Sequence, residues 1–191
     1  MKNKALVISA AFIALILIGG LSYKVIDLTS IQYQNDQMIL KNTLGKGIYH
    51  YILLGENYLE AEPHERFDIL YDLSNNLYGA YSIASALISK DESIEMFYYA
   101  LITHTDQLTR LNQTPQANSE DLMKSNGELK QILIGLKQFR SNYENQNYEQ
   151  LKNDQLIEAW HNFISKLFGQ YHDNSILIEY QKWYPQISNR L

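Results

Sequence analysis

The sequence predicts an all-α protein, with an N-terminal transmembrane helix followed by an antiparallel bundle of about five to six helices. Apolar residues recur at alternating steps of three and four in at least four segments, the spacing of amphipathic helices. No segment keeps the two-residue alternation of a half-buried strand. The corners between the periodic segments are short, which favours antiparallel neighbours.

The composition indicates a globular protein and excludes several classes of function. Hydrophobic residues make up 46% of the 191 residues and charged residues 19%. Without Lys2 and Lys4, which precede the apolar N-terminal block, 14 basic and 21 acidic side chains remain, a net charge of −7. This acidic balance, with no run of Lys or Arg, argues against nucleic-acid binding. The absence of cysteine excludes disulfides and thiolate metal sites.

Residues 1–23 are predicted to form a short cytoplasmic stub and a transmembrane helix. The 19 residues from Ala5 to Tyr23 carry no charge, and as a helix they would span about 28 Å, close to the roughly 30 Å hydrocarbon core. Lys2, Lys4 and the α-amino group precede the segment, so the positive-inside rule places the N-terminus in the cytoplasm. The protein is therefore expected in the cell membrane, with its domain extracytoplasmic.

A secretory signal peptide is the alternative interpretation of the same block. Gly20, Leu21 and Ser22 form a small-x-small cleavage site, and cleavage near Ser22 would yield a secreted protein. Against cleavage, apolar residues continue at helical spacing across 25–31, as if one helix continued beyond the membrane. The domain is extracytoplasmic in both interpretations.

Beyond the apolar block, residues 24–37 are predicted to form a juxtamembrane stalk and residues 38–191 the helical-bundle domain. The stalk prediction rests on a polar run at 32–37 that has no core-facing residues. Gly45 and Gly47 interrupt the first helix of the domain and predict a kink or a break there, because each glycine costs roughly 1 kcal/mol relative to Ala. The next helix is expected to begin near Pro63.

Three long helices of the domain are predicted from regular apolar stripes. The first stripe is Phe67, Leu70, Ser74, Leu77, Tyr81, Ala84 and Ile88. The second is Phe97, Leu101, His104, Leu108 and Leu111. The third is Leu122, Ser125, Leu129, Ile132, Leu136, Phe139 and Tyr143. A capping box at 89–92 is expected to start the second helix, and Pro115 to follow its end.

Two further helices complete the predicted bundle. The segment from Leu156 to Phe168 is too densely apolar for a surface helix, so a central position is expected for it. A short closing helix is expected before Pro185.

The sequence contains no motif for catalysis or metal binding. No two of the five histidines stand three or four residues apart, and no serine lies in a GxSxG or SxxK motif, so we expect no catalytic residue, metal ligand or cofactor. Glu56, Glu60 and His64 could form a cation site at one helix corner. A solvated helix start is the favoured interpretation of these residues.

Four residues are predicted to bind a ligand or partner. His104 occupies a core-stripe position, where a buried neutral histidine can hold a polar ligand or respond to pH near 6.5. Tyr78, Tyr81 and Tyr98 belong to a concentration of tyrosines in the first half of the domain. Tyrosine offers a large contact area and a polar tip, which suits an interface or a cleft.

These features favour a single-pass membrane protein whose domain is a non-catalytic protein-interaction or sensory module. The membrane, through the N-terminal helix, and a protein are the expected partners. A secreted or tethered small-molecule-binding bundle is one alternative. An envelope enzyme with an unrecognised carboxylate site is the other.

Overall fold

The all-α prediction is confirmed for the residues that the structure, a computed structural model, describes: 24–87, 91–114, 119–145 and 150–186. These ranges contain helices and no strand. None of the helices in these ranges is long and apolar enough to cross a membrane. Residues 1–23, where the sequence predicts a transmembrane helix, lie outside the described part of the chain.

The chain divides into two compact units, Met1–Asp36 and Gln37–Leu191. In the first unit, residues 24–35 are helical and all of them are exposed. Their apolar members Val25 and Ile26 are the most open, at 61% and 68% exposure. These residues belong to the segment that the sequence predicts as a stalk.

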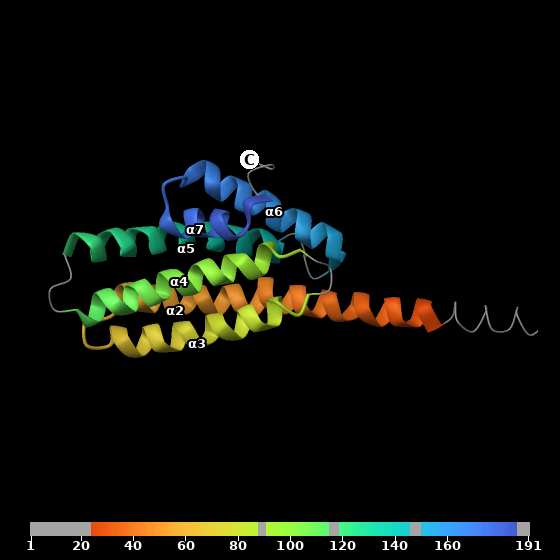
Figure 1. Cartoon of the computed structure of the whole chain (residues 1–191), viewed down its shortest axis with the longest axis horizontal. Coiled ribbons are helices and arrows are strands. Elements are labelled where there is room, and N and C mark those ends of the chain that lie inside the picture. The colour runs from red at the N-terminus through yellow and green to blue at the C-terminus, as the bar shows by residue number, and fades with distance from the viewer. Residues whose placement is uncertain (1–23, 88–90, 115–118, 146–149, 187–191) are drawn as a thin grey trace, which may run out of the picture. The chain divides into compact units, whose positions relative to one another are not determined.

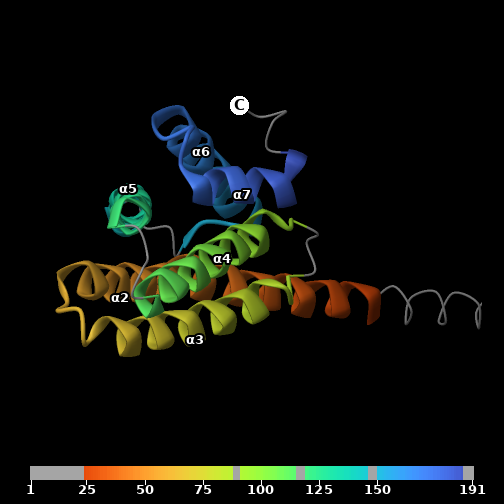
Figure 2. The same cartoon turned by 60° about the vertical axis from the view of Figure 1, so that its left-hand side comes forward.

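The second unit contains six α-helices and one π-helical segment in its described residues. In chain order they are η1 (Asn42–Gly47), α2 (Ile48–Glu60), α3 (Arg66–Ala84), α4 (Ser93–Gln113), α5 (Ser119–Asn145), α6 (Asn153–Gln170) and α7 (Ser175–Trp183). Successive helices run in opposite directions (Figure 1). In both views, α4 lies between α3 on one side and the α6–α7 pair on the other (Figures 1 and 2).

The predicted stripes of α4 and α5 form the centre of the hydrophobic core. From Phe97 to Leu108 on α4, and from Ser125 to Tyr143 on α5, every predicted stripe residue is buried. On α3 the prediction of Phe67 as a core residue is wrong. Phe67 lies in the first turn of α3 and is 46% exposed, whereas Leu70 and Leu77 are fully covered.

The glycines at 45 and 47 do not end the helix. Residues 37–60 stay helical, and the irregularity at the two glycines is the π-helical turn η1 instead of a break. Gly47 is required by a close approach, because a Cβ atom there would lie 2.5 Å from the hydroxyl oxygen of Tyr98. That hydroxyl donates a hydrogen bond of 2.7 Å to the carbonyl of Thr43 within η1. The glycine thus permits α4 to approach η1.

The prediction that residues 156–168 form the central helix is wrong. The central helix is α4, which contacts α3, α5 and α7. One face of α6 is exposed, from Asp154 to Lys166. Its apolar residues are dense because Trp160 is fully buried and contacts the rings of Phe97 and Phe139 at centroid distances of 5.1 and 5.6 Å. One large aromatic cluster therefore joins α6 to α4 and α5.

The second stripe's helix starts after the predicted capping box, and the side chain of its N-cap residue, Glu92, makes no capping hydrogen bond. The second stripe's helix begins at Ser93, whose backbone N–H donates to a carboxylate oxygen of Asp91 at 3.0 Å. Ile88, the last residue of the first stripe, and Ser89, the first residue of the predicted capping box, lie outside the described residues. The closing helix is confirmed as α7, and the side chain of Asn174 caps it by accepting from the N–H of Ile176.

Candidate functional site

The acidic corner between α2 and α3 is built as a helix start. Glu56 pairs with Lys137 on α5 instead of facing His64. Glu65 accepts a hydrogen bond from the N–H of Glu62, which satisfies an amide at the turn before α3. Across the part of the chain that the structure describes, no group of three or more His, Asp or Glu side chains is placed to hold a metal ion.

A serine, a histidine and an aspartate meet between α4 and α6, an arrangement that the sequence does not reveal. Nε2 of His161 lies 3.1 Å from Oγ of Ser93 and 3.0 Å from Oδ2 of Asp91. A catalytic triad needs the serine and the aspartate on different ring nitrogens, so that one proton moves while the other is held. Both contacts here use Nε2, and Ser93 is fully buried. The cluster therefore connects the start of α4 to α6 without the geometry of a nucleophile.

The same cluster changes the acidity of its carboxylate. Burial by itself would raise the pKa of Asp91, but the hydrogen bonds from His161 and Ser93 outweigh it and lower that pKa. The ionised carboxylate is therefore stabilised in the folded state.

His104 lies in the core at the contact between α4 and α5. It is 3% exposed, and its Nε2 is 3.9 Å from a carboxylate oxygen of Glu128. No side chain among the described residues forms a hydrogen bond with its ring nitrogens. Burial lowers the pKa of His104 to about 4, although Glu128 and the backbone of Ser125 oppose the shift. At neutral pH the imidazole is uncharged.

Glu128 also connects His104 to the start of α7. Its carboxylate accepts hydrogen bonds from the hydroxyl of Ser175 at 2.6 Å and from the backbone N–H of Ser175 at 3.3 Å. The side chain of Asn174 donates to the backbone carbonyl of Glu128 at 2.9 Å. Three helices thus meet at one buried carboxylate.

A row of exposed and half-buried aromatic side chains crosses α3, α4 and α7. We call it the aromatic band and define it as Tyr78 and Tyr81 on α3, Tyr99 on α4 and Trp183 on α7. Tyr99 contacts Tyr81 at a centroid distance of 6.1 Å and Trp183 at 5.2 Å in an edge-to-face arrangement. Tyr78 is 52% exposed and lies three residues before Tyr81, on a neighbouring position of the same helix surface.

The structure brings together two of the four residues predicted to bind a partner, and separates the other two. Tyr78 and Tyr81 lie in the aromatic band, whereas Tyr98 and His104 are buried. One helix position turns a side chain by about 100°, so Tyr98 faces η1 while its neighbour Tyr99 faces outward.

Sequence reasoning missed Tyr99 and Trp183. A usable signal for Tyr99 was its position two residues after the stripe residue Phe97, outside the core stripe. For Trp183, no spacing rule links a residue on α7 to one on α4 that is 84 positions earlier.

The charges beside the aromatic band are mainly negative. Partial burial is the main cause that raises the pKa of Tyr81. The negative charge of the neighbouring Glu95 carboxylate raises that pKa further. Glu179 accepts a hydrogen bond of 2.5 Å from the indole N–H of Trp183. Lys182 lies 5.1 Å from the centre of the Trp183 ring and forms an ion pair with Glu179 at 3.5 Å.

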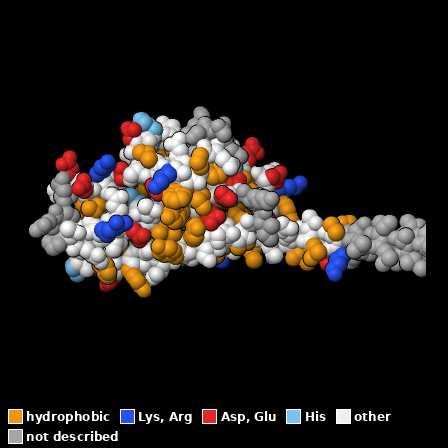
Figure 3. Space-filling model, in the orientation of Figure 1, with side chains coloured by type: hydrophobic (Ala, Val, Ile, Leu, Met, Phe, Trp, Pro, Cys, Tyr) orange, Lys and Arg blue, Asp and Glu red, His pale blue; other side chains and the backbone are white. Residues whose placement is uncertain are grey.

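Hydrophobic side chains also gather in the middle of one face of the molecule in the space-filling view (Figure 3). This face shows α4, with charged side chains of both signs around the hydrophobic patch. Exposed aromatic side chains that already pack against each other lose little further conformational freedom when a binding partner covers them.

No family model, no curated protein and no solved structure matches this chain.

Proposed function

We propose that this protein is a membrane-anchored, extracytoplasmic helical module that binds a protein partner and catalyses no reaction. The observation that carries the proposal is the aromatic band. Three helices contribute to it. Tyr99 contacts both Tyr81 and Trp183, while Tyr78 and Trp183 remain 52% and 44% exposed. Tyrosine and tryptophan are enriched among the residues that dominate binding energy at protein interfaces.

The chemistry of the band favours a basic segment as the partner. The faces of Tyr and Trp rings attract Lys and Arg side chains, each contact contributing about 0.5–1 kcal/mol at exposed sites. Glu95 adds negative charge beside the Tyr81 ring, whereas Glu179 is paired with Lys182. The net charge of −7 beyond the apolar block acts in the same direction and would speed association with a basic protein.

Anchoring is the second part of the proposal, and it rests on the uncharged segment from Ala5 to Tyr23 with Lys2 and Lys4 before it. Native cells are extracted with alkaline carbonate, and the intact mass of the protein is measured in each fraction. Full-length protein in the membrane pellet supports the anchor. A soluble protein whose mass begins near Tyr23 would replace it with a secreted form.

The binding surface is tested by photo-crosslinking in native cells. A photoreactive phenylalanine analogue replaces either Tyr78 or Trp183, and the matched control places it at Ile178, which lies on α7 and is 53% exposed. We expect the two band positions to give the same protein adduct and Ile178 to give none. The crosslinked peptide of the partner should be rich in Lys and Arg.

Two results would count against this function. Equal adducts from Trp183 and Ile178 would mean that the contact is unspecific, and no adduct from either band position would remove the band as a partner surface. The Tyr81→Ala substitution gives a second measurement. It should reduce adduct formation at Trp183 while the thermal unfolding midpoint stays within a few degrees of the wild type.

A further inference from the structure

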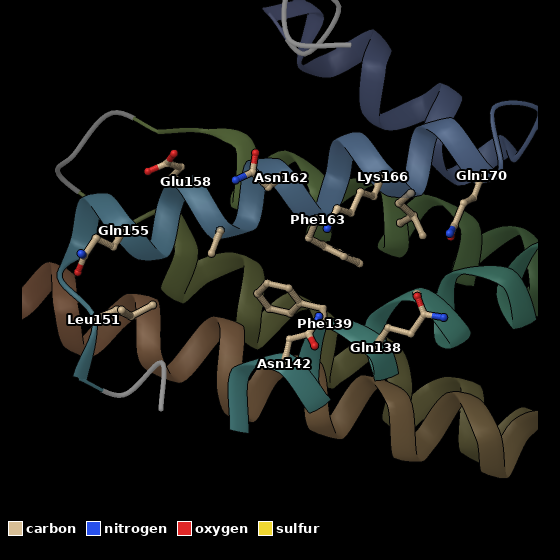
Figure 4. Close-up of a pocket in the computed structure, with 13 residues that line it drawn as sticks. Gln138, Phe139, Asn142, Leu151, Gln155, Glu158, Asn162, Phe163, Lys166 and Gln170 are labelled. Carbon is tan, nitrogen blue, oxygen red and sulfur yellow. The ribbon is translucent and has the colours of Figure 1, made fainter. Parts of the chain in front are cut away.

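A groove between α5 and α6 has the composition of a ligand site and shares no residue with the aromatic band. Its volume is about 430 Å³, within the range of small-molecule sites. Phe139 on α5 and Phe163 on α6 point into the space between the two helices (Figure 4). Gln138 and Asn142 lie along the α5 side of the groove.

Five amide side chains line the groove. The oxygen of Gln155 accepts a hydrogen bond from the backbone N–H of Lys152, and the other four are Gln138 and Asn142 from α5 and Asn162 and Gln170 from α6. None of these four makes a hydrogen bond to another side chain or to the backbone within the described ranges. Each amide offers two donor hydrogens and an acceptor oxygen. The groove therefore presents donors and acceptors together on both of its sides.

The floor of the groove is aromatic and held in place. The rings of Phe139 and Phe163 are 4.8 Å apart, and Phe163 also contacts the buried ring of Trp160 at 5.3 Å. Phe163 is half-buried, so part of its ring is open to the groove. Gly135 faces Leu167 so closely that a Cβ atom there would overlap the leucine side chain. This close approach fixes the two walls relative to each other.

The groove carries little net charge. Glu158 and Lys166 are the charged residues of its lining, and neither forms an ion pair with a described residue. One carboxylate and one ammonium cancel, so a strongly anionic or cationic ligand gains little here. The amides in turn disfavour a purely apolar ligand such as an acyl chain, because their hydrogen-bonding groups would be desolvated.

We propose that this groove binds a neutral oligosaccharide. A sugar ring has an apolar face of C–H groups and a rim of hydroxyls that both donate and accept hydrogen bonds. The face matches the ring of Phe163, and the hydroxyls match the amides of Gln138, Asn142, Asn162 and Gln170. An extended peptide offers the same hydrogen-bonding groups, but it lacks a flat apolar face for the aromatic floor, so the sugar is favoured.

The proposal is tested by isothermal titration calorimetry on the full-length protein with chitotetraose, cellotetraose and maltotetraose. At least one of the three should bind saturably at or below millimolar concentration. The Gln138→Ala/Asn142→Ala double substitution should weaken that binding by about tenfold or more, since it removes two hydrogen-bonding side chains. The matched control is Asn75→Ala/Asn76→Ala, which removes two exposed amides from α3 and should leave the affinity unchanged.

Three outcomes would overturn the proposal. One is that none of the three tetrasaccharides binds at millimolar concentration. Another is that both double variants weaken binding equally. The third is that a neutral Gly/Ser/Asn octapeptide binds, with sensitivity to Gln138→Ala/Asn142→Ala, while the sugars do not. Circular dichroism on each variant shows whether the helical fold is retained, and Phe163→Ala should abolish sugar binding in a folded protein.

Discussion

Lowering the pH from 7 to 5 should destabilise this protein through a single side chain, His104. Its imidazole is 3% exposed, and burial keeps it neutral, with a pKa of about 4. The carboxylate of Glu128 at 3.9 Å favours the charged form but does not overcome the loss of solvation. In the unfolded chain the same group titrates near the reference value of 6.5.

The direction of the change in stability depends on whether the folded or the unfolded state is protonated first as the pH falls. Between pH 6.5 and about pH 4, the unfolded chain binds more protons at His104 than the folded protein does. Stability therefore falls as the pH falls through this window. The loss attributable to this group is about 2 kcal/mol at pH 5 and approaches about 3 kcal/mol below pH 4, at 1.36 kcal/mol for each pH unit between the two values. Above pH 7 the group contributes no pH dependence.

Urea unfolding of the full-length protein at pH 7 and pH 5, followed by circular dichroism, measures this loss. The His104→Gln variant lacks the titrating group. Between pH 7 and pH 5 it should therefore lose about 2 kcal/mol less free energy of unfolding than the wild type loses. His50→Gln replaces an exposed histidine on α2 and serves as the control. If His104→Gln and the wild type lose the same stability between pH 7 and pH 5, the argument from burial is refuted.

Two further predictions concern packing and capping. Gly47→Ala should lower the free energy of unfolding by about 1–3 kcal/mol, because its Cβ would lie 2.5 Å from the Tyr98 hydroxyl. The control Gly79→Ala, whose Cβ would meet no neighbouring atom within 4 Å, should raise the free energy of unfolding by up to about 1 kcal/mol. A double-mutant cycle with Tyr98→Phe should recover part of the Gly47→Ala loss, and full additivity would contradict the steric explanation. Asp91→Asn should cost about 1–3 kcal/mol at pH 7 in urea unfolding, because the ionised carboxylate accepts from Ser93. Since the pKa of Asp91 is lowered, that cost should shrink as the pH falls below 3.8, and a cost independent of pH would contradict it.

The local periodicity of the sequence predicted the helices and most of their buried faces. A helix repeats every 3.6 residues whatever its neighbours are, so Leu129, Ile132 and Leu136 on α5 could be assigned to the core before any partner helix was known. The same reasoning placed His104 inside. It failed for Phe67, because periodicity indicates a face and does not indicate where neighbouring helices stop covering it.

The functional candidates depended on information that periodicity lacks. The aromatic band joins Tyr81 to Tyr99 and Trp183 across three helices, and the groove joins Gln138 to Asn162 across two. Such pairings are set by the crossing of helices and by ring packing, and both are properties of the assembled core.

What the sequence alone determined is the class of the fold, the acidic character of the domain and the uncharged segment from Ala5 to Tyr23. The tertiary structure decided that Tyr98 supports the core while Tyr99 faces the surface, and that His161 meets Ser93 over a separation of 68 residues. Helix formation depends on residues within one or two turns, so the sequence encodes it locally. A binding surface depends on which helix faces meet, and that is decided only when the whole chain packs.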